Sequence, residues 1–163
     1  FLVTGNSLPA DGILFDPFMR EELVCVAPMD DPFVLEHSYV KNNRRYIRLE
    51  DFGEKPFILG YPNMKSRMAS NQAFHTLGCK PKVIMQTQNS YTASILAYHG
   101  LGYALVPLNL SRMKGGADFP VYYLDERLQA SWPVGIASLK QTGLSRAAEQ
   151  LKKAIMETKG TSD

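Results

Sequence analysis

Short apolar runs alternate with helical periodicities through the middle of the chain. Strand-like runs occupy residues 57–59, 82–86, 103–106 and 121–124. Between the first three runs, the pattern predicts a helix from about residue 64 to 77 and another from Asn89 or Ser90 to Gly100. Such alternation is typical of a mostly parallel sheet with helices on its faces, so the sequence predicts an α/β fold.

Apolar patterning continues on both sides of this central region. Strands are expected at residues 1–3, 13–18, 22–28 and 134–139. The clearest amphipathic helix lies near the C-terminus, where helical spacing relates Leu144, Ala147, Ala148, Leu151 and Ile155, and Thr142 is the expected N-cap. Residues 34–45 are polar and aperiodic, which predicts a loop or a short helix, and residues 108–118 read as a connection.

Particular residues within the central helices have expected roles. Met64, Met68, Phe74 and Leu77 form the predicted apolar stripe of the first helix. Gly78 and Gly100 are expected to end the two helices in a left-handed conformation. Gly102 is expected to allow close packing before the next strand.

Composition limits the classes of function. The 163 residues suffice for one domain or two small lobes, and 45% hydrophobic with 21% charged residues is ordinary globular usage. A formal net charge of +2 argues against nucleic-acid binding by this chain. The most basic run, residues 41–45, reads as a solvated loop. No apolar run approaches the ~18–20 residues of a membrane span, so no membrane partner is expected.

Motifs for catalysis, metals or cofactors are absent from the sequence. Cys25 and Cys79 lack metal or redox spacing, Cys25 is expected to be buried, and the three histidines are scattered. Neither GxSxG nor GxGxxG occurs. The carboxylates of Glu50, Asp51 and Glu54 fall on a surface-like turn. No catalytic residue, metal or cofactor is therefore predicted.

Polar residues precede both central helices, at the edge of the sheet where open α/β folds bind ligands. In residues 59–67, the first-turn amides, the side chains of Asn63 and Ser66, and the charges of Lys65 and Arg67 favour a carboxylate or small oxyanion. Thr87, Asn89 and Ser90 stand before the second helix. The alternative is that Asn63 and the second polar group only cap their own helices.

Three segments in order carry a resemblance to a family: EELVCVAPMDDPF, RLEDFGEKPFILGYPNMKSRMASNQAFHTLGCKPKV and NSYTASILAYHGLGYALVP. Together they resemble the effector-binding domain of LysR-type transcriptional regulators over about residues 20–110. The ordered positions are Glu50, Asp51, Phe52, Pro56, Phe57, Ile58, Phe74, Gly78, Pro81, Gly100, Gly102 and Pro107.

The resemblance implies a type 2 periplasmic-binding-protein-like fold of two α/β lobes. Lobe I would comprise about residues 1–28 and 137–163, lobe II about 29–130, and the crossing strands would lie near 22–28 and 132–137. A small, anionic metabolite would bind between the lobes. The residues implied in binding are Gly60, Tyr61, Asn63, Met64, Lys65, Ser66, Thr87, Asn89, Ser90 and Thr4.

The same resemblance implies a cytoplasmic, non-enzymatic sensor that reaches DNA only through a winged-helix domain outside this chain. Lobe I is expected to be incomplete, which would expose apolar surface on Phe1, Val3 and the last helix. Self-association, as a dimer, or weak effector binding, or both, would follow. The alternatives are an extracytoplasmic solute-binding protein of the same fold and an enzyme built on it.

Overall fold

The computed structural model describes residues 2–4, 11–111 and 119–157, and it divides into two compact units. Unit 1 comprises Phe1–Glu21 and Trp132–Asp163, and unit 2 comprises Glu22–Ser131. Strands and helices alternate through unit 2, which confirms the predicted α/β class. That these units correspond to the two predicted lobes stays a prediction.

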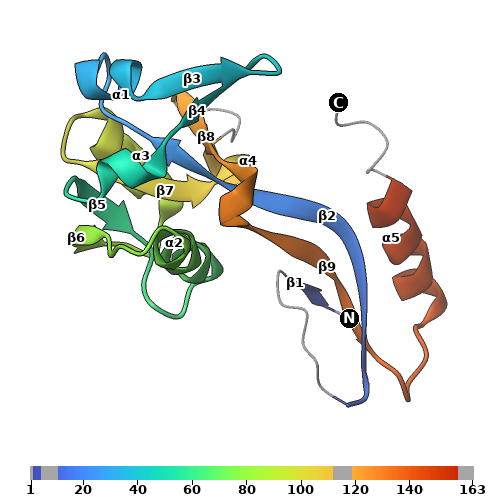
Figure 1. Ribbon diagram of the computed structural model, residues 1–163. Coiled ribbons are helices and arrows are strands. Elements are labelled where there is room, and N and C mark those ends of the chain that lie inside the picture. The colour runs from blue at the N-terminus through green and yellow to red at the C-terminus, as the bar shows by residue number, and fades with distance from the viewer. Residues whose placement is uncertain (1, 5–10, 112–118, 158–163) are drawn as a thin grey trace. The chain divides into compact units, whose positions relative to one another are not determined.

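Unit 2 is built around a mixed sheet with the strand order β3-β4-β8-β2-β7-β5-β6 (Figure 1). The strands are β2 (Ile13–Val26), β3 (Ser38–Lys41), β4 (Arg44–Ile47), β5 (Pro56–Leu59), β6 (Lys82–Gln86), β7 (Tyr103–Pro107) and β8 (Val121–Leu124). Because β2 is antiparallel to both β7 and β8, strands β4, β8, β7, β5 and β6 all run in one direction. Their carboxyl ends therefore meet at one edge of the sheet.

Short and long helices connect these strands. They are α1 (Pro32–Glu36), the 3₁₀ helix η1 (Leu49–Phe52), α2 (Lys65–Thr76), α3 (Ser90–Tyr98), α4 (Leu108–Ser111) and the 3₁₀ helix η2 (Glu126–Leu128). Helices α2 and α3 match the two predicted central helices. Gly78 and Gly100 follow them with φ values of 70° and 90°, which confirms the expected left-handed ends.

Helices α2 and α3 cover opposite faces of the sheet, as the alternation along β5 demonstrates (Figure 1). The ring of Phe57 lies 5.1 Å from that of Phe74 on α2. The next residue, Ile58, belongs to the buried cluster that includes Ala93 and Ala97 of α3. All of these side chains are almost fully buried. Burial of each large apolar side chain contributes about 1.5–3 kcal/mol, so both helices are fixed to the sheet by packing.

Two smaller predictions about unit 2 are also confirmed. Cys25 has no exposed surface, and its burial raises the pKa of the thiol. Gly102 lies so close to β5 that a Cβ atom there would stand 2.6 Å from the carbonyl oxygen of Pro56. Glycine is therefore required at position 102 by the close approach of two backbones.

Unit 1 contains β1 (Leu2–Thr4), the first part of β2, most of β9 (Ser131–Leu139) and α5 (Arg146–Glu157). Strand β9 pairs with both β1 and β2. No residue of α5 is buried, and the side chain of Leu151 on its apolar stripe is 52% exposed. Val3 is also exposed, as expected, whereas Phe1 lies outside the described residues.

Several expectations about local structure were wrong. Residues 34–45 contain the end of the short helix α1, which was one of the two expected alternatives, but the rest forms the unexpected hairpin β3–β4, whose turn residues Asn42 and Asn43 have φ values of 52° and 58°. The two strands expected at residues 13–18 and 22–28 form the single strand β2. The N-terminus of α5 is capped by Ser145, not Thr142, because the Ser145 hydroxyl accepts a hydrogen bond from the Ala148 amide. Met68 is half exposed, and Ser66 and Ser70 are buried on α2 in its place.

Replacement of Gly102 by alanine tests the close approach of β7 and β5. We expect Gly102→Ala to lower the free energy of unfolding by about 1–3 kcal/mol, because the added Cβ forces the two backbones apart. Gly53→Ala is the matched control, since the Cβ there would meet nothing nearer than the Glu50 carbonyl oxygen at 4.0 Å. Urea unfolding measures both changes, and equal losses for the two variants would contradict the packing argument.

Candidate functional site

The loops after β5 and β6 start side by side at the carboxyl edge of the sheet. Strands β5 and β6 are paired in parallel so that Leu59 stands opposite Gln86. The backbone amide of Thr87 donates a hydrogen bond to the carbonyl oxygen of Leu59 at 3.1 Å. Helix α2 begins after the first loop and α3 after the second. The structure therefore places the beginnings of these two loops next to each other, and whether the two helix starts share one site stays a prediction.

The N-terminus of α2 has no side-chain cap. Its N-cap residue is Met64, whose backbone amide donates to the carbonyl oxygen of Tyr61 at 2.9 Å in a tight turn. The expected alternative that Asn63 caps this helix is wrong, because Asn63 is exposed and makes no such bond. No side chain therefore occupies the first-turn amides of Lys65, Ser66 and Arg67, and these amides retain their capacity to bind an anion.

The side chain of Ser66 lies beside Gly60 of this loop. The residue is only 5% exposed, and its hydroxyl makes no hydrogen bond to the described part of the chain. Every buried side-chain oxygen or nitrogen among those residues has a partner, so the Ser66 oxygen must reach solvent. A Cβ on Gly60 would lie 3.1 Å from this oxygen and 3.0 Å from the Met64 sulfur. Gly60 therefore leaves room beside the hydroxyl.

Arg67 has a structural role that the sequence did not reveal. One terminal guanidinium nitrogen donates to the carbonyl oxygen of Gly60 at 2.9 Å, and Nε donates to Oδ1 of Asn71 at 3.0 Å. The guanidinium thus ties the loop after β5 to the body of α2. Lys65, by contrast, has an exposed side chain in the first turn of the same helix.

The loop before α3 is shaped by its own polar residues. Asn89 caps α3, because its side-chain oxygen accepts hydrogen bonds from the amides of Tyr91 at 2.9 Å and Thr92 at 3.1 Å. The Thr87 hydroxyl accepts from the Asn89 amide at 3.1 Å. Ser90 is the first residue of the helix. The capping alternative is thus confirmed for Asn89, whereas the N-terminus of α2 stays open.

The remaining predicted residues are more dispersed. Tyr61 lies in the first loop with its side chain 41% exposed. Thr4 is the last residue of β1 in unit 1, and its side chain lies outside the described part of the structure. Whether Thr4 shares a site with the two loops stays a prediction.

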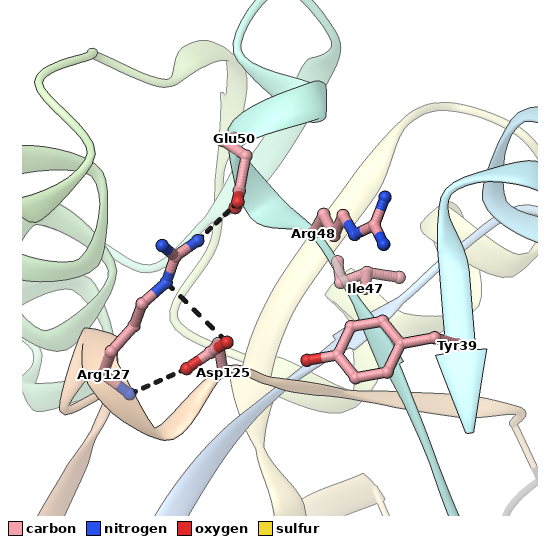
Figure 2. A pocket seen from close by; sticks show the side chains of 6 residues that line it. All are labelled: Tyr39, Ile47, Arg48, Glu50, Asp125 and Arg127. Carbon is pink, nitrogen blue, oxygen red and sulfur yellow. Dashed lines mark hydrogen bonds and ion pairs between the residues drawn. The ribbon is translucent and has the colours of Figure 1, made fainter. Parts of the chain in front are cut away.

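A polar pocket at the ends of β4 and β8 was missed by sequence reasoning. It has a volume of about 230 Å³ and is lined by Tyr39, Ile47, Arg48, Glu50, Asp125 and Arg127. Figure 2 shows Arg127 between Glu50 and Asp125, with the Tyr39 hydroxyl directed toward Asp125. Arg127 forms ion pairs with both carboxylates, the pair with Asp125 at 3.7 Å.

The electrostatics of this pocket follow from the same groups. Desolvation, and then the negative charge of Asp125, raise the pKa of the Tyr39 phenol. The hydrogen bond to Glu50 raises the pKa of Arg127. Glu50 is exposed on the turn η1, as expected, and the pairing of β4 with β8 brings this turn to the pocket. The sequence feature that could have indicated this pocket is Asp125, a carboxylate that directly follows the strand β8.

The described residues meet the requirements of neither a metal site built from His, Cys, Asp and Glu side chains nor a membrane-spanning helix. Within residues 2–4, 11–111 and 119–157, no group of three or more His, Cys, Asp and Glu side chains could hold a metal ion. No helix in those ranges is long and apolar enough to cross a membrane.

Comparison with known proteins finds a matching family model. A family model described as the LysR substrate binding domain matches residues 1–159. The solved regulatory domain of CcmR from Synechocystis PCC6803, in complex with 2-PG, is 16% identical with a TM-score of 0.78, over 98% of this chain and 73% of that chain. No protein of curated function matches the sequence.

Two further solved structures have the same fold. The effector-binding domain of QuiR in complex with shikimate is 18% identical with a TM-score of 0.73, over 97% of this chain and 70% of that one. The C-terminal domain of a probable LysR family transcriptional regulator from Rhodococcus sp. RHA1 is 25% identical with a TM-score of 0.71. That match covers 91% of this chain and 70% of the Rhodococcus chain.

Two asparagines test which helix start is capped. We expect Asn89→Ala to lower the free energy of unfolding by about 1 kcal/mol, because α3 loses the acceptor for two amides. Asn63→Ala should change it by less than about 0.5 kcal/mol, because that side chain caps nothing. Urea unfolding compares the two variants. A loss for Asn63→Ala as large as that for Asn89→Ala would show that Asn63 does cap α2.

Proposed function

This chain belongs to the family of LysR substrate binding domains, and we propose that it senses a small anionic effector at the loops after β5 and β6. The family consists of effector-binding domains of transcriptional regulators. The proposal assigns the chain a sensing role without a catalytic step. It places the effector against Gly60, Ser66 and the uncapped start of α2.

The open N-terminus of α2 is the observation that carries this proposal. Three first-turn amides without a side-chain cap lie next to a hydroxyl that makes no hydrogen bond to the described residues. The positive end of a helix dipole favours an anion at such amides. Ser66 adds a neutral donor, and the Gly60 backbone allows close approach. A carboxylate or a small phosphate matches this set of donors.

The ligands of two structural neighbours agree with that chemistry. CcmR was solved with 2-PG and QuiR with shikimate, and shikimate carries a carboxylate. At 16% and 18% identity these neighbours show a shared fold, and their ligands support the proposed class of effector without identifying it. Thr87 and Ser90 border the same edge and are proposed to limit the size of the bound group.

The wider role of the chain follows from the same family. We propose that effector binding changes the conformation of the domain and that this change is relayed to a DNA-binding domain outside the 163 residues. The exposed apolar stripe of α5 is proposed to support self-association as a dimer.

Thermal unfolding in the presence of small anions tests the effector site. 2-PG and shikimate serve as probes beside a panel of related carboxylates and phosphates. A ligand at about 100 times its Kd stabilises the folded state by about 2.7 kcal/mol, which raises Tm. For any ligand found, we expect Ser66→Ala to raise Kd roughly tenfold to a hundredfold, because a hydrogen bond to a charged group is lost.

Thr76→Val is the matched control for this experiment. It removes a hydroxyl from the same helix, but at the end where that hydroxyl bonds only to the Gln72 carbonyl oxygen. Kd should therefore stay unchanged in Thr76→Val. A ligand whose Kd is the same in wild type and Ser66→Ala would show that the effector binds elsewhere.

Self-association is tested on α5 by a pair of variants that add the same charge. Leu151→Glu places a carboxylate on the exposed apolar stripe, and we expect it to raise the dimer dissociation constant at least about tenfold. Gln150→Glu adds a carboxylate beside the stripe and should leave that constant nearly unchanged. Sedimentation velocity over a concentration series measures both. Dimers of equal strength in the two variants would exclude the α5 stripe as the interface.

A further inference from the structure

A second, larger pocket in unit 2 lies along α2 and the turn that leads into β6. Its volume is about 550 Å³, within the range of small-molecule sites. We propose that this pocket binds a small organic anion with an apolar body, such as an aromatic carboxylate. The pocket shares Arg67 with the proposed effector site, but the proposal does not depend on the effector assigned to that site.

The inner surface of the pocket is mostly apolar. Pro81 and Val83 contribute half-buried side chains to the lining, and Phe74, which is fully buried, also lines the pocket. Val83 belongs to β6, which has a single strand neighbour in the sheet order. The pocket therefore lies at the edge of the described sheet. An apolar ring or short chain placed here removes apolar surface from water, which is the main source of affinity in such sites.

The ionisable side chains of Arg, Lys and His that line the pocket are basic, and no acidic side chain lines it. Lys80 and Arg67 line it together with His75. Glu50 is the carboxylate that acts on the nearby Cys79, whose pKa is raised by desolvation and then by that charge. Glu50 itself forms an ion pair with Arg127. An anionic group at the rim would thus meet cations without a competing negative side chain in the lining.

Arg67 gives the pocket a polar group held in a fixed position. Its hydrogen bonds to Gly60 and Asn71 use two of its five N–H donors. The remaining donors of a guanidinium held in this way need little further ordering to bind a carboxylate. Lys80, by contrast, is exposed and supplies a mobile charge at the rim. The pocket therefore offers an apolar floor, one ordered cation and one flexible cation.

Cys79 provides a direct reporter of occupancy. It lines the pocket and is half-buried, whereas Cys25, the other cysteine of the chain, has no exposed surface. The Cys79 thiol lies 3.7 Å from the Phe74 carbonyl oxygen. A bound molecule would cover this thiol. Labelling of the native protein by a maleimide reagent therefore measures access to the pocket, and Cys79→Ser gives the background rate.

The test compares 2-naphthoate with its neutral counterpart 2-naphthalenemethanol. At about four times its Kd, 2-naphthoate should slow Cys79 labelling about fivefold, because only the free fraction of the protein reacts. The alcohol should give much weaker protection at the same concentration. Lys80→Gln should raise Kd for 2-naphthoate about threefold, as expected for one partly exposed ion pair. Lys82→Gln removes a nearby charge outside the lining and should leave Kd unchanged.

Each other outcome overturns the proposal. Equal protection by the acid and the alcohol would show that charge plays no part. A rise in Tm on addition of 2-naphthoate without protection of Cys79 would place its binding elsewhere, including at the loops after β5 and β6. Protection that is equally strong in Lys80→Gln and wild type would remove Lys80 from the site and the stated ligand class with it. Absence of any protection would show that the pocket does not bind this chemistry.

Discussion

The parallel pairing of β5 with its two neighbours is the constraint on which the rest of unit 2 depends. Phe57, Ile58 and Leu59 have no exposed surface, and β5 is hydrogen bonded to β6 on one side and β7 on the other. Neighbouring strands lie about 4.8 Å apart. The loops after β5 and β6 must therefore start one strand spacing from each other. The separation between the first residues of the two loops is therefore set by strand pairing in the core.

The N-termini of α2 and α3 are both preceded by polar residues, but they differ in whether a side chain accepts hydrogen bonds from their first-turn amides. Asn89 satisfies two amides of α3, whereas no side chain does so for α2. A missing cap costs about 1 kcal/mol of stability. Functional sites commonly contain such locally destabilising features, because the same groups are needed for binding. The open start of α2 is thus the more informative of the two, although its sequence appeared to contain a cap at Asn63.

The sequence predicted features that depend on local patterns and missed those that depend on distant pairing. Helices α2 and α3, their glycine ends and the buried Cys25 follow from periodicity and turn chemistry within a few residues. The β3–β4 hairpin was missed because Asn42-Asn43 is a weaker turn signal than Asn-Gly. The placement of Glu50 beside Asp125 depends on β4 pairing with β8, which are more than 70 residues apart in the chain. Ser66 was buried by packing that polar composition does not indicate.

Arg67 shows why charge counted along a sequence is a poor guide to charge in a site. It was expected to add positive charge for a ligand, yet its guanidinium holds the Gly60 carbonyl oxygen and the Asn71 side chain. A hydrogen bond from a charged donor is stronger than a neutral one, so the loop is held firmly against α2. Binding that requires less ordering of the protein has higher affinity for the same contacts. Arg67 therefore fixes the positions of the backbone groups around Gly60 and Ser66, and in the proposed site the selectivity for an anion would come from the direction of the amides.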